Sequence, residues 1–565
     1  MPTLSYSKED VSNYFELDKL DELAKYAKCE IELDNENNQV IFEFGDTNLP
    51  FVWSLENFAL LVGNILKAKK VKGHRERKIV KEIQIKKPIG DIVVDKSLKD
   101  IRPYVVGFMA ETKEGISEEF ILELVQLQEK LSDSFGKKRE RNAVGIYKGD
   151  LIKFPINYTT KDPSFEFIPL EYKVPLSLKD ILNEHEKGKE YKKLVEKFDK
   201  YPILIDKSKK VLSFPPIINS NDVGRIEPGD KKLFVESTGL NIEEVMLVGN
   251  ILMKTFELKG FEVSPVTIKY AYDVEIEQEN KNIKTKKLSL PFSPKNFIYI
   301  SEKDVEDLIG IELTKKEIVD LLKSYLYDVE ISEGKIKVIV PYLRNDIMHK
   351  YDIIEDIAIA YGYENIPDKK INFFSQGETT KKVKIINILR DYLVGFGFVE
   401  TFNHVLTSKK VLFENMNEGK KDFIEIKNYV SENYSIVRNS LLPLLLEFAA
   451  KNKTKGYPQR LFEAGETTSL KRYKKESYNL AGLIIEKESN FSYLKSMIDG
   501  IGNLLNKEFL FEKISDKRFL EGRSAKILFE KKEIGIIGEI HPKVLNNFGI
   551  GSPILAFELE LDFLD

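Results

Sequence analysis

Apolar and polar positions alternate with two different periods along this 565-residue chain. A period near 3.6 residues predicts amphipathic helices, whereas strict alternation predicts half-buried strands. Four segments show the helical period: 11–27, 55–66, 120–135 and 242–260. Three segments favour strands. Segment 29–44 is divided by an Asn-rich turn, and segment 201–214 is divided by Lys-Ser-Lys-Lys. The third segment, 233–237, is expected to end at Thr238-Gly239. Pro215-Pro216 cannot continue a central strand, so a turn is expected there.

The order of these segments predicts a multidomain α+β protein, because 565 residues are too many for one core. Residues 1–87 indicate a small mixed domain followed by a basic linker, and residues 88–287 a larger domain of short strands and two helices. Residues 288–367 alternate helix and strand and end in an acidic helix. In residues 368–565, strand alternation and glycine turns favour an antiparallel sheet that carries helices.

The acidic helix predicted within Pro341–Pro367, with its C-terminal stop at Gly362, has two chemically distinct faces. Its apolar stripe consists of Ile353, Ile354, Ile357, Ala358 and Tyr361. Its acids, with one more just upstream, are Asp346, Asp352, Glu355 and Asp356. Like charges one turn apart repel by about 0.2–0.5 kcal/mol per pair, so such a cluster favours a counter-charge. Two interpretations stay open at this point, a solvated acidic face and a site for a hard cation such as Mg²⁺, which prefers oxygen ligands.

Composition narrows the class of protein. The single cysteine, Cys29, excludes an intramolecular disulfide and a thiolate zinc cage and fits a reducing cytoplasm. No apolar run approaches the length of a membrane span, and the first residues do not begin a signal peptide. The net charge of −4 gives no overall attraction to nucleic acid, so such contacts need local basic patches. One basic run is either a solvated linker or a phosphate contact: Lys69, Lys70, Lys72, Arg75, Arg77, Lys78 and Lys81.

Several short motifs, taken in order, point to a known family. They are LQEKL at 127–131, LSFPPIINS at 212–220, ESTG at 236–239, R-x-D-I at 344–347 with DIIEDIA at 352–358 and GYENIP at 362–367, SENYSIVRNSLLP at 431–443, RLFEAGE at 460–466 and IGEIHPKVL at 537–545. Together they resemble the β subunit of phenylalanyl-tRNA synthetase in its archaeal and eukaryotic cytosolic form. The resemblance implies an α₂β₂ enzyme in which the α subunit uses ATP to charge tRNA(Phe). It also implies no room for the additional C-terminal anticodon-binding domain of the bacterial form.

The resemblance further implies roles for particular regions and residues. Residues 88–287 would be an editing domain that binds tRNA and hydrolyses mischarged Tyr-tRNA(Phe), residues 288–367 a winged-helix-like domain, and residues 368–565 a class II synthetase-like domain without catalytic motifs. The implied editing pocket consists of Leu204 as an apolar wall, Glu236 as the group that recognises the tyrosine hydroxyl, and Ser213, Asn219 and Thr238, which orient substrate and water. Arg225 is a candidate tRNA contact. The implied Mg²⁺ ligands, at the junction with the α subunit, are Asp346, Asp352, Glu355 and Asp356.

Two other functions are weighed against this interpretation. In a catalytic class II synthetase, Arg460 and Glu463 would form the Arg-x-x-Glu strand that grips ATP. A second arginine should then follow in a glycine-rich strand that leads into a helix, but Gly522-Arg523-Ser524-Ala525 lacks the glycine repeat and leads into a predicted strand. A structural role for Arg460 at a strand edge is therefore expected. The other alternative is a non-catalytic tRNA-binding or scaffold protein of a synthetase complex.

Overall fold

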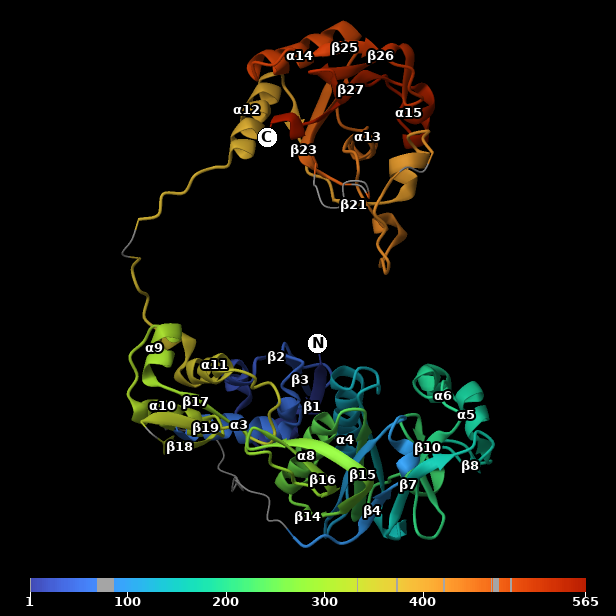
Figure 1. Cartoon of the computed structure of the whole chain (residues 1–565), viewed down its shortest axis with the longest axis vertical. Coiled ribbons are helices and arrows are strands. Elements are labelled where there is room, and N and C mark those ends of the chain that lie inside the picture. The colour runs from blue at the N-terminus through green and yellow to red at the C-terminus, as the bar shows by residue number, and fades with distance from the viewer. Residues whose placement is uncertain are drawn as a thin grey trace. The chain divides into compact units, whose positions relative to one another are not determined.

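The computed structural model describes residues 2–68, 86–332, 334–371, 374–419, 422–468, 470, 477–487 and 490–564. The chain forms two compact units, Met1–Lys369 and Lys370–Asp565 (Figure 1). All seven cations of the predicted basic linker lie outside the described residues. Among the helices of the described ranges, none has the length and apolar character needed to cross a membrane.

The N-terminal region is a three-stranded antiparallel sheet covered by a helix. Its strand order is β1 (Thr3–Ser7), β3 (Gln39–Phe44) and β2 (Cys29–Asp34), and the helix is α3 (Leu55–Ala68). The two predicted strands and the predicted helix at 55–66 are thereby confirmed. The single helix predicted over 11–27 is wrong, because this segment is divided into the end of α1 (Lys8–Ser12), the short helix α2 (Leu20–Ala24) and two 3-10 turns. The adjacent Ser12 and Asn13, whose side chains compete for backbone hydrogen bonds, lie at the first break.

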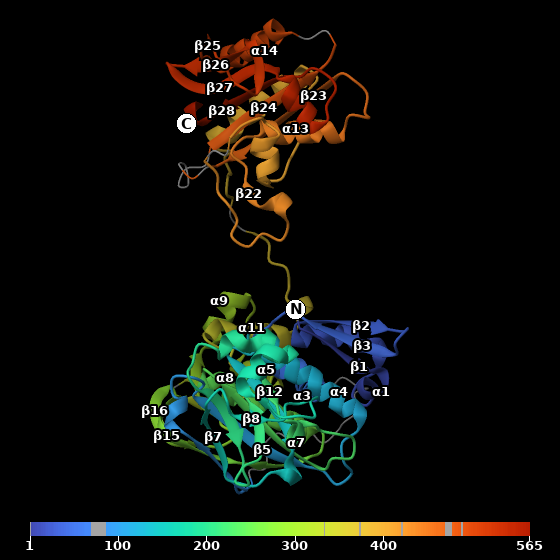
Figure 2. The ribbon, with the colours of Figure 1, turned by 90° about the vertical axis from the view of Figure 1, so that its right-hand side faces the viewer.

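Two sheets form the centre of the first unit. The larger one runs β12 (Ile218–Asn219), β11 (Val211–Phe214), β10 (Tyr201–Ile205), β7 (Ile156–Lys161), β4 (Asp91–Val94), β15 (Thr267–Gln278) and β16 (Lys281–Leu288). The smaller one runs β14 (Glu262–Pro265), β5 (Tyr104–Glu111), β13 (Lys232–Gly239) and β6 (Asn142–Lys148). Figure 2 shows the β15–β16 hairpin at the end of the larger sheet.

The predicted elements of this region are mostly present. The β10–β11 hairpin, the turn at Pro215-Pro216 and the helix α8 (Ile242–Leu258) are confirmed. The helix predicted over 120–135 is α4 (Glu118–Lys130) followed by a wider π-helical turn. The predicted stop of the strand at Thr238-Gly239 is wrong. Both residues continue β13, because β5 and β6 pair with them on either side.

The last part of the first unit carries the acidic helix. Its antiparallel sheet has the order β17 (Phe297–Ile300), β19 (Lys335–Ile339) and β18 (Asp328–Ser332), and its helices are α9 (Glu302–Ile309), α10 (Lys315–Ser324) and α11 (Lys350–Tyr361). One continuous cluster of buried apolar side chains extends from Leu4 to Ala360. The first three predicted regions therefore share one core.

The second unit is a sheet with helices on both faces. Its order is β20 (Val399–Glu400), β23 (Gln459–Thr467), β24 (Ser477–Ile485), β28 (Leu555–Glu560), β27 (Lys532–Ile540), β26 (Phe519–Phe529) and β25 (Leu510–Lys513). Helices α12 (Lys381–Gly395) and α14 (Phe491–Leu504) pack in one core, and α13 (Leu442–Lys451) and α15 (Pro542–Phe548) in another. All neighbouring strands are antiparallel except β20 and β23, as the alternation predicted.

Candidate functional site

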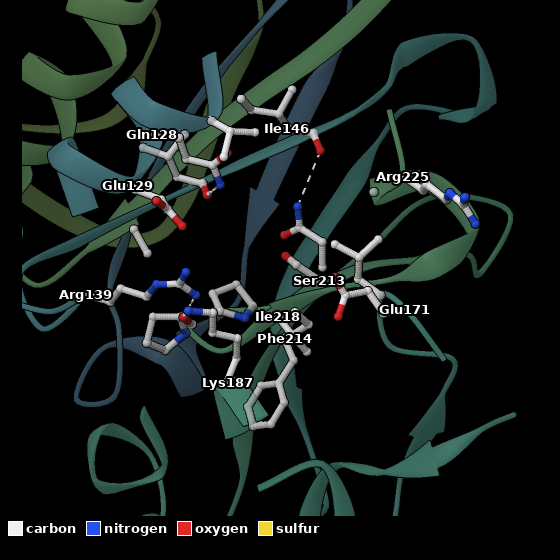
Figure 3. A pocket seen from close by; sticks show the side chains of 18 of the residues that line it. Gln128, Glu129, Arg139, Ile146, Glu171, Lys187, Ser213, Phe214, Ile218 and Arg225 are labelled. Carbon is white, nitrogen blue, oxygen red and sulfur yellow. Dashed lines mark hydrogen bonds between the residues drawn. The ribbon is translucent and has the colours of Figure 1, made fainter. Parts of the chain in front are cut away.

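A cavity of about 740 Å³ lies in the first unit, between the two sheets and helix α4. Its walls come from α4, β6, β11, β12 and β13, from the corner at Pro215-Pro216, and from residues 185–187 (Figure 3). Figure 3 shows Ser213 between Arg139 on one side and Arg225 on the other. This volume is in the range of small-molecule sites, about 300–1,000 Å³. Five residues singled out from the sequence line it: Ser213, Asn219, Arg225, Glu236 and Thr238.

Strand pairing explains why these residues meet. Ser213 on β11 lies directly opposite Asn219 on β12, so their side chains share one face of the larger sheet. Glu236 and Thr238 are two residues apart on β13 and therefore share one face of the smaller sheet. Asn219 also donates from Nδ2 to the Ile146 carbonyl oxygen at 3.4 Å, across the gap between the sheets. The cavity is thus built from both sheets.

Leu204 does not contribute the apolar wall that the resemblance implied. It is opposite Ser213 on β10 and faces the same side of the sheet, but it lies one strand farther from the edge. There the sheet face is covered by the core, and Leu204 is fully buried within it and absent from the cavity lining. Other apolar residues line the cavity, among them Ile121 and Val125 on α4 and Ala143 on β6.

Glu236 is the buried acid of the cavity, with only 3% of its surface exposed. Its Oε1 accepts a hydrogen bond from the Tyr147 hydroxyl at 2.9 Å, and its Oε2 has no hydrogen-bond partner among the described residues. Burial raises the pKa of Glu236 to about 7, while the Tyr147 hydrogen bond and the Arg102 charge act in the opposite direction. The cavity therefore offers one unsatisfied carboxyl oxygen, whose burial is costly without a partner.

Arg102 binds Thr238, which lies on the same face of β13 as Glu236. Its guanidinium donates to Thr238 Oγ1 at 3.1 Å and to the Thr238 carbonyl oxygen at 2.7 Å. It also donates to the carbonyl oxygens of Arg139 and Glu140, both at 3.2 Å. Arg102 is almost fully buried, and burial lowers its pKa to about 10, so it remains charged at neutral pH.

Arg139 forms part of the cavity rim. It follows Lys137 and Lys138 in a run of three left-handed backbone conformations, which are unusual for residues with side chains. Its guanidinium donates to the carbonyl oxygens of Pro216 and Ile217 and lies 4.4 Å from the ring centre of Tyr191. The rim is therefore tied to the cis-proline corner next to Ser213.

Sequence reasoning missed Tyr147, Arg102 and Arg139 as parts of this site. Their contacts reach residues 37 to 136 positions away in the sequence, so no local spacing reveals them. The available signals were the arginine before Pro103 and the basic run at 137–141, and neither signal identifies a pocket.

The four acids near α11 do not gather around one point, although Asp346 and Asp356 share Arg344 as a partner. Asp346 accepts two hydrogen bonds from Arg344, at 2.7 and 2.6 Å, and Asp352 caps the helix by accepting from the backbone of Met348 and His349. Glu355 pairs with Lys28 of the N-terminal region at 2.9 Å.

Asp356 corrects the sequence interpretation, because it is buried and not on a solvated acidic face. It accepts from the Tyr327 hydroxyl at 2.6 Å and lies 3.0 Å from Arg344. Within the described ranges, no three acids, histidines or cysteines gather closely enough to hold a metal ion. As arranged in this chain, the four carboxylates do not fit a Mg²⁺ site, and the shared magnesium ion stays a prediction about the assembled enzyme.

Family models match two neighbouring stretches of the chain. A family model described as tRNA synthetase B5 domain matches residues 298–363, and one described as phenylalanyl tRNA synthetase beta chain CLM domain matches residues 366–561. The chain is 36% identical over 572 residues to the phenylalanine–tRNA ligase beta subunit of Pyrococcus horikoshii, which covers 99% of both chains. This chain belongs to the phenylalanine–tRNA ligase β-subunit family.

Other members of the family agree in length. The beta subunit of Borreliella afzelii is 33% identical over 98% of this chain and 97% of its own. The crystal structure of an N-terminal fragment of the Pyrococcus horikoshii phenylalanyl-tRNA synthetase beta subunit matches with a TM-score of 0.56 and 34% identity. That match covers 64% of this chain and 100% of the fragment.

Arg460 and Glu463 in the second unit of this family member do not form an open Arg-x-x-Glu pair. Arg460 donates to Glu486 at 3.1 and 2.8 Å and to the Phe396 carbonyl oxygen at 2.6 Å. Glu463 is buried and pairs with Arg438 at 2.5 Å. Gly522 and Arg523 lie within strand β26, as expected, and Arg523 pairs with Glu539. The side chains that would grip ATP in a catalytic relative are thus engaged with protein groups.

Proposed function

We propose that this chain is the β subunit of an α₂β₂ phenylalanine–tRNA ligase in which the α subunit uses ATP to charge tRNA(Phe). The cavity of this chain hydrolyses the ester bond of tyrosine that is mistakenly attached to that tRNA. Family membership supports the first part. One observation carries the second, namely that Glu236 presents a buried, unpartnered carboxyl oxygen in a cavity of about 740 Å³.

The physical need for such a site is clear. A charging pocket shaped for a phenyl ring rejects a ring that merely adds a hydroxyl only about 10²-fold. A second site that hydrogen-bonds the hydroxyl can reject phenylalanine in turn, because its own buried polar group would remain unpaired. Glu236 meets this requirement, since Oε2 gains a partner with tyrosine and none with phenylalanine.

The proposed reaction uses the cavity walls in distinct roles. The tyrosyl ring lies against the apolar part of the lining, and its hydroxyl donates to Glu236. Ser213, Asn219 and Thr238 orient the ester and the attacking water. Water adds to the ester carbonyl carbon, the bond to the ribose oxygen breaks, and the ribose oxygen takes up a proton while tyrosine leaves as the acid. Arg225, 68% exposed at the rim, contacts the tRNA.

The test is release of tyrosine from Tyr-tRNA(Phe) by the assembled enzyme. Wild type is expected to release tyrosine rapidly, and Glu236→Ala is expected to be slower by about tenfold or more. Arg523→Ala, a surface change in the second unit, serves as the control and should match wild type. Equal rates for wild type and Glu236→Ala would leave the proposed recognition without support.

A further inference from the structure

Glu236 is held by a neighbour that lies behind the cavity wall. Tyr147 is fully buried on β6 and does not line the cavity, yet its hydroxyl donates to Glu236 Oε1 at 2.9 Å. The ring of Tyr147 stacks on Phe234 with 5.9 Å between ring centres, which fixes the direction of the hydroxyl. Among the described residues, only Oε1 of the Glu236 carboxyl group accepts a hydrogen bond.

Glycine makes this contact possible. Gly145 lies directly opposite Glu236 on β6, two residues before Tyr147, so it shares a sheet face with both. A Cβ atom at position 145 would overlap both the Tyr147 hydroxyl and Glu236 Oε1. The absence of a side chain at Gly145 thus leaves the space in which the hydroxyl and the carboxyl meet.

We infer that Tyr147 is a specificity-positioning residue, which holds Oε1 of Glu236 so that Oε2 alone is presented to the substrate hydroxyl. This inference rests on the proposed function. A carboxyl group that can rotate freely could pair its oxygens with water or with nearby donors and so tolerate a phenyl ring. With Oε1 fixed, Oε2 finds a partner only when the substrate ring carries a hydroxyl.

The same contact affects the protonation of Glu236. The charged and titratable groups that act on Glu236 among the described residues are Arg102, Tyr147 and Tyr158. The Tyr147 hydrogen bond lowers the pKa of Glu236 against the larger effect of burial. Removing that hydroxyl should raise this pKa further, so that the acid stays protonated to a higher pH.

The experiment compares hydrolysis of Tyr-tRNA(Phe) and Phe-tRNA(Phe) by the assembled enzyme, measured as kcat/KM from about pH 6 to pH 9. Tyr147→Phe keeps the stacked ring and removes only the hydroxyl, and Gly145→Ala keeps the hydroxyl and displaces it. Tyr270→Phe is the matched control, because Tyr270 is a buried tyrosine whose hydroxyl donates to the Val105 carbonyl oxygen and not to an acid.

Both test variants are expected to lower the preference for Tyr-tRNA over Phe-tRNA by about tenfold. Tyr147→Phe should also shift the midpoint of the pH profile upward, whereas Tyr270→Phe should change neither quantity. If Tyr147→Phe keeps the wild-type preference and pH midpoint while Glu236→Ala loses activity, the inference about Tyr147 is wrong and the proposed function stands. If wild type itself releases no tyrosine, the proposed function fails.

Discussion

Arg102 and Thr238 are joined by two hydrogen bonds across 136 residues of sequence, one to the hydroxyl oxygen at 3.1 Å and one to the carbonyl oxygen at 2.7 Å. Arg102 also holds the carbonyl oxygens of the rim at Arg139 and Glu140. The buried guanidinium of Arg102 therefore connects Thr238, which lines the cavity, to the rim. Its planar fork matches this arrangement of acceptors, which a lysine ammonium cannot reproduce.

Arg102→Lys is accordingly expected to slow tyrosine release from Tyr-tRNA(Phe) by about tenfold or more, because Thr238 and the rim lose their common support. Charging with phenylalanine should stay within about twofold of wild type, since that reaction is assigned to the α subunit. Both rates are measured on the same preparation of assembled enzyme. Unchanged tyrosine release by a folded Arg102→Lys variant would refute this role.

The motifs of the sequence named five residues that the structure brings to one cavity, but not the residues that reach the cavity through tertiary contacts. Ser213, Asn219, Glu236 and Thr238 were named from the family resemblance of two short motifs, LSFPPIINS and ESTG. Tyr147 could not be identified in this way, because its role depends on the pairing of β6 with β13. Leu204 was assigned to the wall from the family resemblance, which does not show how far into the sheet it lies.

The acidic helix shows a second limit of prediction from the sequence. Asp356 was placed on the polar face, but it follows Ile353 by three positions and precedes Ala360 by four, and both of these residues are fully buried. Helical periodicity therefore puts Asp356 at the edge of the apolar stripe. Whether the side chain at such a position is exposed to solvent or buried depends on its partners, here Tyr327 and Arg344 from other segments.

This burial predicts unequal effects of two neighbouring substitutions. Asp356→Asn should lower the free energy of unfolding by on the order of 3 kcal/mol, because Arg344 loses a buried partner. Glu355→Gln should cost less than about 1 kcal/mol, because its pair with Lys28 is partly exposed. Denaturant unfolding can be followed through Trp53, the only tryptophan, which is fully buried in the first unit.

The same measurement addresses the predicted magnesium ion. Each of the four acids already has a protein partner. A chelator should therefore leave the free energy of unfolding of the isolated chain unchanged, in wild type and in both variants. A chelator-dependent loss of stability that Asp356→Asn abolishes would show that this chain holds the metal by itself.

Glu236 also predicts a pH dependence of stability. Burial raises its pKa in the folded chain to about 7, so between about pH 4.5 and pH 7 the folded state holds a proton that the unfolded state has lost. This contribution to stability is full below that window and is lost as the pH rises through 7. Glu236→Gln does not titrate, so its stability relative to wild type should increase by on the order of 2 kcal/mol from pH 5 to pH 8. An equal difference at both pH values would contradict the buried environment of Glu236.

The second unit predicts that the isolated chain is unable to charge tRNA. Arg460 and Glu463 are engaged with Glu486 and Arg438, so no open pair is available for ATP. Phe-tRNA formation by the purified chain should stay at background and appear when the α subunit is added. Robust charging by the isolated chain would overturn the division of labour between the subunits.

We propose above that the cavity of this chain removes tyrosine from tRNA(Phe). The most direct measurement is the accumulation of Tyr-tRNA(Phe) when the assembled enzyme is incubated with tyrosine, ATP and tRNA(Phe). Wild type should accumulate almost none, whereas Glu236→Ala should accumulate Tyr-tRNA while charging phenylalanine at the wild-type rate. Equal accumulation of Tyr-tRNA by the two enzymes would contradict this proposal.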